Sequence, residues 1–158
     1  MQAFATQHPG LFPAGIAVLF IILWFASGFL VGLASGWQSL AERYRTEREF
    51  PAHRRRMQSA QLRAGMGYNN VLTLGSDAEG LYLGVLALFR IGHPRLLVPW
   101  ADVVVEEPRR YLFVMMRTLR LGPGAIPLRV REPLAEFLLA GKTASGVAVQ
   151  DRGMKWGI

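Results

Sequence analysis

All charged side chains of this chain lie C-terminal to residue 41. Between Met1 and Ala41 there is no Asp, Glu, Lys or Arg, whereas all 11 acidic and all 18 basic residues follow from Glu42 onward. Such a division predicts two environments, an apolar N-terminal segment and a charged C-terminal domain.

The uncharged run Leu11–Trp37 predicts a membrane-spanning helix. It is longer than the roughly 20 helical residues that cross a bilayer core of about 30 Å. Pro13 falls in the first turn, where a missing N–H costs no intrahelical hydrogen bond. Trp37 is expected to act as an aromatic anchor at the membrane interface. Residues 1–10 then form a short extracytoplasmic N-terminus.

A cleaved signal peptide is the alternative interpretation of this run. Signal peptides carry a basic N-terminal region and an apolar core of about 7 to 15 residues, and the N-terminus here has no Lys or Arg. The flank Glu42–Arg56 contains six Arg and three Glu, and a positive flank stays in the cytoplasm. The sequence therefore predicts a single-pass helix with the N-terminus outside and the C-terminus inside the cell.

Three glycines, Gly28, Gly32 and Gly36, recur at four-residue spacing near the end of this run. On a helix they would share one face, where a second helix could approach closely. Glycine is also common in membrane helices generally, so both interpretations stay open. The expected partner is a second copy of the chain or another membrane protein.

Residues 38–56 predict a basic juxtamembrane linker. Most of its charge is explained as a solvated run that stops translocation. Arg54, Arg55 and Arg56 would each gain about 1 kcal/mol from anionic lipid near the membrane. Nucleic-acid binding is the weaker alternative because no aromatic side chain is interspersed in this arginine run to stack on bases.

From residue 57 to 141, short apolar runs separated by Gly and Pro predict a mainly β domain. Ser76–Gly80 predicts a hairpin turn, and Pro99 predicts an interruption of the strand at Leu96–Val105. Arg109–Leu121 is predicted as one strand, with a helix as the alternative because of Met115 and Met116.

The alternation in residues 126–131 predicts that Ile126, Leu128 and Val130 face the core. Pro133 then opens a short helix that ends near Gly141, and residues 142–158 form a C-terminal tail. The predicted fold class is one N-terminal transmembrane helix plus a curved antiparallel sheet or half-barrel, closed by this short helix.

The stretch YNNVLTLGSDAEGLYLGVLALFRIGHPRLLVPWADV, Tyr68–Val103, preceded by SGWQSLAERYR, resembles a group of uncharacterised bacterial single-pass membrane proteins with a small cytoplasmic domain. Its GLYL, FR.GHP and PW.D steps also resemble bacterial pleckstrin-homology-like or GRAM-like domains. The resemblance implies a binding or scaffolding domain at the bacterial inner membrane. It transfers no activity and no site residues.

Candidate catalytic groups are few. The chain has no cysteine and three histidines, none of them paired at the i, i+4 spacing of a helical metal site. We therefore expect neither a metal nor a cofactor. His93 and Asp102 would form an acid–base pair only if the fold brought them together. The alternative is that Gly92-His93-Pro94 is a turn with an exposed histidine.

These features predict a non-enzymatic accessory or scaffold protein of the inner membrane, with its soluble domain in the cytoplasm. It would dock onto a membrane complex through its helix and its β domain. The alternative is an anionic-lipid-binding module, and an enzyme using His93 and Asp102 is the third possibility. A rim for a lipid or partner protein is predicted at Arg90, His93, Arg95 and Trp100.

Overall fold

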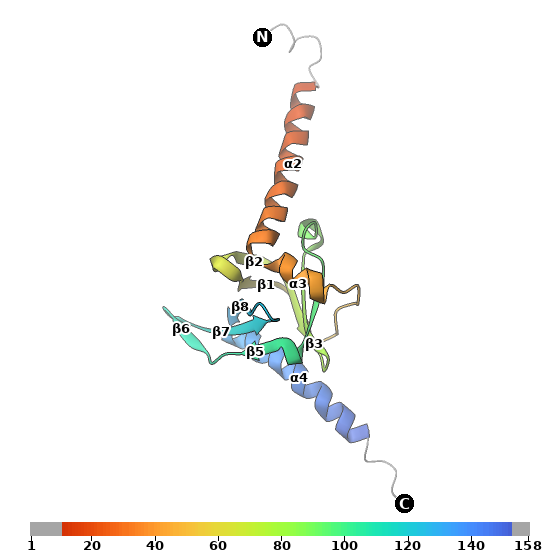
Figure 1. The fold of residues 1–158 in the computed structure, drawn as a ribbon, viewed down its shortest axis with the longest axis vertical. Coiled ribbons are helices and arrows are strands. Elements are labelled where there is room, and N and C mark those ends of the chain that lie inside the picture. The colour runs from red at the N-terminus through yellow and green to blue at the C-terminus, as the bar shows by residue number, and fades with distance from the viewer. Residues whose placement is uncertain (1–10, 153–158) are drawn as a thin grey trace, which may run out of the picture.

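An apolar helix, a curved antiparallel sheet and a C-terminal helix follow one another along the molecule (Figure 1). The computed structural model describes residues 11–152. The first helix, α2 (Leu11–Ala34), projects away from the sheet, and only 6% of its most apolar window is buried. Its segment Phe12–Ala34 is long and apolar enough to cross a bilayer.

The helix ends three residues before the predicted boundary at Trp37. Gly36 adopts a left-handed backbone conformation, with a φ of 82°, which glycine tolerates without steric cost. A separate short helix, α3 (Trp37–Tyr44), begins there in a new direction. Trp37 therefore belongs to the domain and is completely buried, so its prediction as a membrane-interface anchor is wrong.

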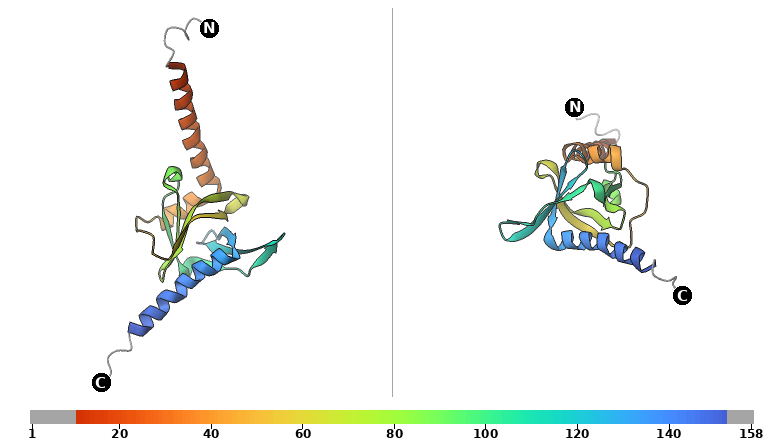
Figure 2. Two further views of the ribbon diagram at one scale, coloured as in Figure 1. Left: turned by 180° about the vertical axis from the view of Figure 1, so that it is seen from behind. Right: turned by 60° about the horizontal axis from the view of Figure 1, so that its bottom comes forward.

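The described residues contain one eight-stranded antiparallel sheet. Its strands are β1 (Arg54–Gln61), β2 (Gly67–Ser76), β3 (Gly80–Val85), β4 (Leu96–Pro99), β5 (Val103–Val105), β6 (Arg109–Tyr111), β7 (Val114–Leu121) and β8 (Ile126–Arg131). Three 3-10 turns interrupt them: η1 (Arg63–Gly65), η2 (Ala87–Phe89) and η3 (Trp100–Asp102). The order β4-β3-β2-β1-β8-β7-β5, with β6 beside β7, curls into a nearly closed barrel (Figure 2).

Helices cover the two ends of this barrel. α3 packs its buried Leu40, Ala41 and Tyr44 into the end nearest α2. At the opposite end α4 (Glu132–Arg152) packs Leu134, Ala135 and Leu138 against the sheet. The two helices exclude water from the leucine-rich core between them.

Several local predictions are confirmed. Ile126, Leu128 and Val130 of β8 are all buried, as their alternation requires. The Ser76–Gly80 turn joins β2 to β3, and the Asp77 side chain accepts hydrogen bonds from the backbone N–H groups of Glu79 and Gly80. Strand pairing stops at Pro99, which is followed by η3.

Other boundaries differ from the predictions. The predicted linker 38–56 contains most of α3, and Arg54, Arg55 and Arg56 begin strand β1. Because α3 supplies part of the core, the domain starts near Trp37 instead of residue 57. The last helix continues to Arg152, into the predicted tail. The predicted N-terminus 1–10 and the last six residues of that tail lie outside the described residues.

The predicted single strand Arg109–Leu121 is wrong. The chain reverses at Leu112 and Phe113, so that β6 and β7 form a hairpin with Tyr111 opposite Val114. No Gly or Asn marks this turn in the sequence, which is why a local pattern does not reveal it.

Candidate functional site

The junction between α2 and the sheet is closely packed. A Cβ atom placed on Gly32 of α2 would lie 3.0 Å from the Gly92 carbonyl oxygen and 3.2 Å from Cε1 of His93. The Trp37 indole Nε1 donates to the Pro94 carbonyl at 2.9 Å, and the Gln38 amide donates to the Gly92 carbonyl. The segment between β3 and β4 is therefore held against both helices.

A buried polar network lies at this junction. The Ser35 hydroxyl lies 2.8 Å from the Tyr68 hydroxyl, which in turn lies 2.9 Å from Nε2 of His93. The Trp37 ring contacts the rings of both Tyr68 and His93. His93 is only 3% exposed, so the predicted exposed turn histidine is wrong.

Burial sets the protonation of this network. Desolvation lowers the pKa of His93 below its ordinary value, because water no longer stabilises the imidazolium. Burial also raises the pKa of Tyr68, so its phenol stays protonated. In neutral His93 the proton is on Nδ1, which faces the Ile91 carbonyl. Its Nε2 then accepts a hydrogen bond from the Tyr68 hydroxyl.

An apolar groove of about 290 Å³ runs beside the network, between α2 and the segment joining β3 to β4. It is lined by Trp24, Phe25, Ser27, Gly28, Val31, Gly67, Tyr68, Asn69, Val71, Leu88, Phe89, Ile91 and His93. Its wall is formed mainly by aromatic and aliphatic side chains, while Tyr68 and His93 supply a polar end. Such a lining suits an apolar chain better than a charged ligand.

The predicted basic residues are divided between two places. Arg54, Arg56, Arg90 and Arg95 line one surface groove of about 430 Å³, together with Glu49. Arg55 instead points to α4, with its guanidinium 4.3 Å from the centre of the Phe137 ring. The fold thus brings arginines from two distant segments of the sequence to one surface.

The predicted rim of Arg90, His93, Arg95 and Trp100 is not one surface. His93 is buried against Tyr68, whereas the Trp100 indole donates to the Asp77 carbonyl at 2.7 Å. Lys142 of α4 lies over the Trp100 ring. Only Arg90 and Arg95 of the four share a groove with open space.

His93 and Asp102 do not form a pair. Asp102 accepts a hydrogen bond from the Tyr44 hydroxyl at 2.8 Å, whereas His93 is bonded to Tyr68. Within the part of the chain that the structure describes, no group of three His, Asp or Glu side chains could hold a metal ion.

The three glycines have different surroundings. Gly32 contacts Gly92 and His93, and a Cβ on Gly36 would lie 3.1 Å from the Ile126 side chain. Both therefore pack on the protein's own domain. Gly28 has open space around it, where it lines the apolar groove. Association through this helix stays a prediction.

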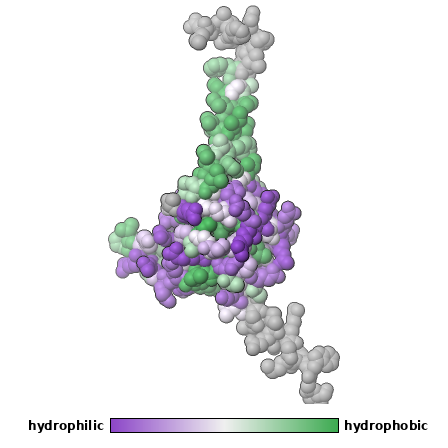
Figure 3. Space-filling model, viewed as in Figure 1, coloured by the Kyte–Doolittle hydropathy of each residue, from purple (hydrophilic) through white to green (hydrophobic). Residues whose placement is uncertain are grey.

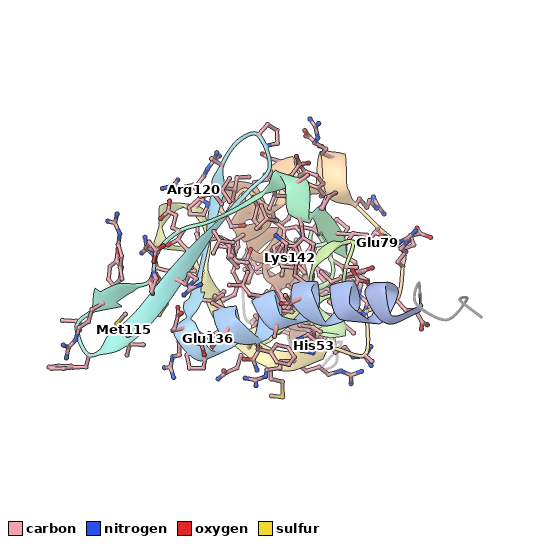
Figure 4. All side chains as sticks on the ribbon, turned by 90° about the horizontal axis from the view of Figure 1, so that it is seen from below. His53, Glu79, Met115, Arg120, Glu136 and Lys142 are labelled. Carbon is pink, nitrogen blue, oxygen red and sulfur yellow. The ribbon has the colours of Figure 1, made fainter. Side chains whose placement is uncertain are left out.

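Sequence analysis missed the exposed tip of the β6–β7 hairpin. Leu112 and Phe113 are 88% and 90% exposed, and their neighbours Tyr111, Val114 and Met115 are also exposed. The hairpin projects from the domain, with Met115 near its tip (Figure 4), and it forms an apolar patch on a largely hydrophilic surface (Figure 3). The absence of polar turn residues between Arg110 and Arg117 is the signal that could have revealed it.

The burial of His93 predicts a pH-dependent stability. As the pH falls, the unfolded chain takes up a proton at the ordinary histidine pKa, before the folded chain does. Stability is therefore present above about pH 6.5 and is lost as the pH falls below it. We expect the melting temperature of the full chain in detergent to fall between about pH 7.5 and about pH 5.

The variant His93→Gln should show a clearly smaller decrease over the same pH interval. Tyr68→Phe is the matched control: it removes a hydrogen bond and lowers stability, but it keeps the buried imidazole and so keeps the pH dependence. An equal pH dependence in wild type and His93→Gln would contradict this interpretation.

Gly32 and Gly28 provide a second test of the junction. Gly32→Val forces a side chain against Gly92 and His93, and overpacking of this kind costs about 1–3 kcal/mol. Gly28→Val enters open space and should leave the melting temperature of the purified chain unchanged. Equal effects of the two substitutions would show that α2 is not packed on the domain.

Comparison with known proteins finds no relative. No protein-family model matches the chain, and neither a curated protein nor a solved structure matches it significantly. The resemblance to pleckstrin-homology-like domains therefore stays a prediction, and the function is inferred from residues and contacts alone.

Proposed function

We propose that this protein is a membrane-anchored docking protein, which holds a small β domain at the cytoplasmic face of the membrane and presents the β6–β7 tip to a partner. The exposed Leu112 and Phe113 carry this proposal. Bulky apolar residues at a hairpin turn do not stabilise the domain that bears them, and exposed apolar patches mark interaction sites.

The surroundings of α2 support the anchor. Its apolar side chains are almost all exposed, and the described part of the chain supplies no surface that would bury most of them. A cleaved signal peptide agrees less well with the junction, because Gly32 and Ser35 contact residues of the domain. The excess of arginine after the helix favours a cytoplasmic location of the domain, and the resemblance adds the bacterial inner membrane.

The backbone conformation of Leu112 at the β6–β7 tip supports a role of this residue in docking. Leu112 has a φ of 53°, a conformation that glycine and asparagine adopt far more readily than a bulky residue. Leucine at this position therefore costs stability without improving the turn. A requirement for its exposed side chain explains why it is there.

Charges around the tip indicate the chemistry of the partner. The Arg129 guanidinium lies 4.7 Å from the centre of the Tyr111 ring, and Arg109, Arg110 and Arg131 are exposed nearby. Nε of Arg129 is buried without a hydrogen-bond partner among the described residues. A partner with an apolar pocket edged by carboxylates would complement this surface. An integral membrane protein would present such a pocket close to the membrane, where α2 anchors the domain.

The curved sheet and its C-terminal helix support a pleckstrin-homology-like domain as the scaffold of this function. Such a fold would place interaction surfaces on loops and hairpins, whose changes disturb the core least.

We expect the double variant Leu112→Gly, Phe113→Asn to lose the partner without losing stability. Of the two turn residues only Leu112 has a positive φ, and two-residue hairpin turns of this kind prefer glycine at the first position, so the hairpin is retained while the apolar tip is removed. Size-exclusion chromatography after mild solubilisation from the native membrane would show the wild type in a larger complex and the variant outside it.

Val104→Ser is the matched control for that experiment, because Val104 is an exposed apolar residue on β5 and not at the tip. It should leave the complex intact. A wild-type chain that runs without any partner, or a double variant that keeps its partner, would count against docking through the tip.

A second candidate function is recognition of anionic lipid headgroups. The convergence of Arg54, Arg56, Arg90 and Arg95 on one groove favours it, because clustered arginines bind phosphate through charge-assisted hydrogen bonds. Glu49 lines the same groove and reduces its net positive charge.

Native mass spectrometry of the full chain tests this candidate. Phosphatidylglycerol should remain bound in preference to phosphatidylcholine, and Arg56→Gln with Arg90→Gln should abolish the preference. Arg109→Gln with Arg110→Gln, two exposed arginines on β6, should not. Equal retention of both lipids by the wild type would exclude headgroup recognition.

A further inference from the structure

We propose that the segment joining β3 to β4, Leu86–Ile91, is a second membrane-embedded segment, whose Leu88, Phe89 and Ile91 side chains lie among lipid acyl chains beside α2. We call it the β3–β4 loop. The proposal rests on the anchoring of the chain by α2, and it adds a contact between the domain and the bilayer that the single helix does not provide.

The composition of the loop is unusual for a hairpin connection. Its sequence is LALFRI, with one charged residue. Leu88 is 68% exposed and Ile91 is 54% exposed, whereas loops in water mostly carry polar residues at such positions. No other segment of the described structure buries these two side chains. Their burial therefore requires an apolar environment outside the chain.

The loop lies beside α2, where the lipid bilayer would surround it. It rises beside the lower part of α2 in both side views (Figures 1 and 2). The Phe89 ring lies 5.7 Å from the ring of Trp24, and Trp24 is ten positions before the end of the helix at Ala34. At 1.5 Å per residue, the loop reaches about 15 Å along the helix.

A bilayer core is about 30 Å thick, so this length places Phe89 within the hydrocarbon when α2 spans it. The groove between α2 and the loop is then open to acyl chains instead of water. Its apolar lining and its volume of about 290 Å³ suit one such chain.

Several backbone groups of the loop form hydrogen bonds within the protein, as an apolar environment requires. Polar backbone groups must be satisfied internally where water is absent. The N–H groups of Phe89, Arg90 and His93 donate to carbonyls three residues earlier in the chain. Side chains of the junction pair two further carbonyls: His93 faces the Ile91 carbonyl and Gln38 donates to the Gly92 carbonyl.

Arg90 does not oppose insertion. It is exposed, and it lines the grooves beside α3 and β3 instead of the apolar groove. A long arginine side chain can extend its guanidinium to the headgroups while its aliphatic stem stays in the hydrocarbon. Leu88, Phe89 and Ile91 then form the inserted tip.

Depth-dependent quenching in the full chain tests this proposal. Because the chain has no cysteine, Leu88→Cys, Leu23→Cys and Val104→Cys each give a single labelling site for an environment-sensitive fluorophore. The labelled chains are reconstituted in vesicles of phosphatidylcholine and phosphatidylglycerol, with a nitroxide on the acyl chain of a fraction of the lipid. Leu23 in α2 reports anchoring, and Val104 on β5 is the surface control.

Insertion predicts a blue-shifted emission at Leu88 and a loss of fluorescence to the lipid nitroxide equal to that at Leu23. Ile91→Cys should behave in the same way, whereas Val104 should be quenched only by aqueous iodide. Iodide quenching at Leu88 and Ile91, with lipid quenching at Leu23, would overturn the proposal and leave the anchor intact. Loss of lipid quenching at Leu23 as well would instead refute the anchoring by α2.

Discussion

The burial of Trp37 is the interaction on which the arrangement of this molecule depends. Trp37 opens α3 only three residues after α2 ends, and its side chain is fully enclosed by the sheet domain. Its indole donates to the Pro94 carbonyl and contacts the rings of Tyr68 and His93. The N–H of a buried tryptophan usually finds a hydrogen-bond partner, and here that bond holds the start of α3 against the segment before β4. The buried Ser35–Tyr68–His93 network and the apolar groove lie beside this contact.

The two ends of the barrel consequently have different roles. At one end, α3 closes the core next to the apolar helix, and Phe89 of the β3–β4 loop contacts Trp24 of that helix. At the other end, α4 covers the core, and the His53 ring stacks on Phe137 of that helix. Sheet edges exposed to solvent invite pairing with other chains, and here the edge at β4 is partly occupied by a bridge between Arg45 and Leu96. Among the described residues, exposed apolar side chains gather on α2, on the β3–β4 loop and at the β6–β7 tip.

Arginine is distributed according to these surfaces. Arg54, Arg56, Arg90 and Arg95 meet on the outer face of the sheet, and a different set surrounds the β6–β7 tip. Ion pairs such as Arg117 with Glu132 and Arg120 with Glu106 use part of the remaining charge within the domain. The net charge of +7 therefore reflects two separate basic surfaces instead of one uniform field. Different arginines would therefore bind the two candidate partners, an acidic protein surface and an anionic lipid.

Features that depend on neighbouring residues could be predicted from the amino-acid sequence: the apolar helix, the alternation of Ile126, Leu128 and Val130, the turn at Asp77 and the break at Pro99. Hydropathy and turn chemistry are local properties, so a short window suffices to detect them. The site could not be predicted in this way, because the partners of His93 are distant in the chain: Tyr68 lies 25 residues before it and Trp37 lies 56 residues before it. Whether a histidine is exposed in a turn or enclosed beside an apolar helix depends on which distant segments pack around it, and no local pattern carries that information. The same holds for Leu112 and Phe113, where only the pairing of β6 with β7 reveals a turn.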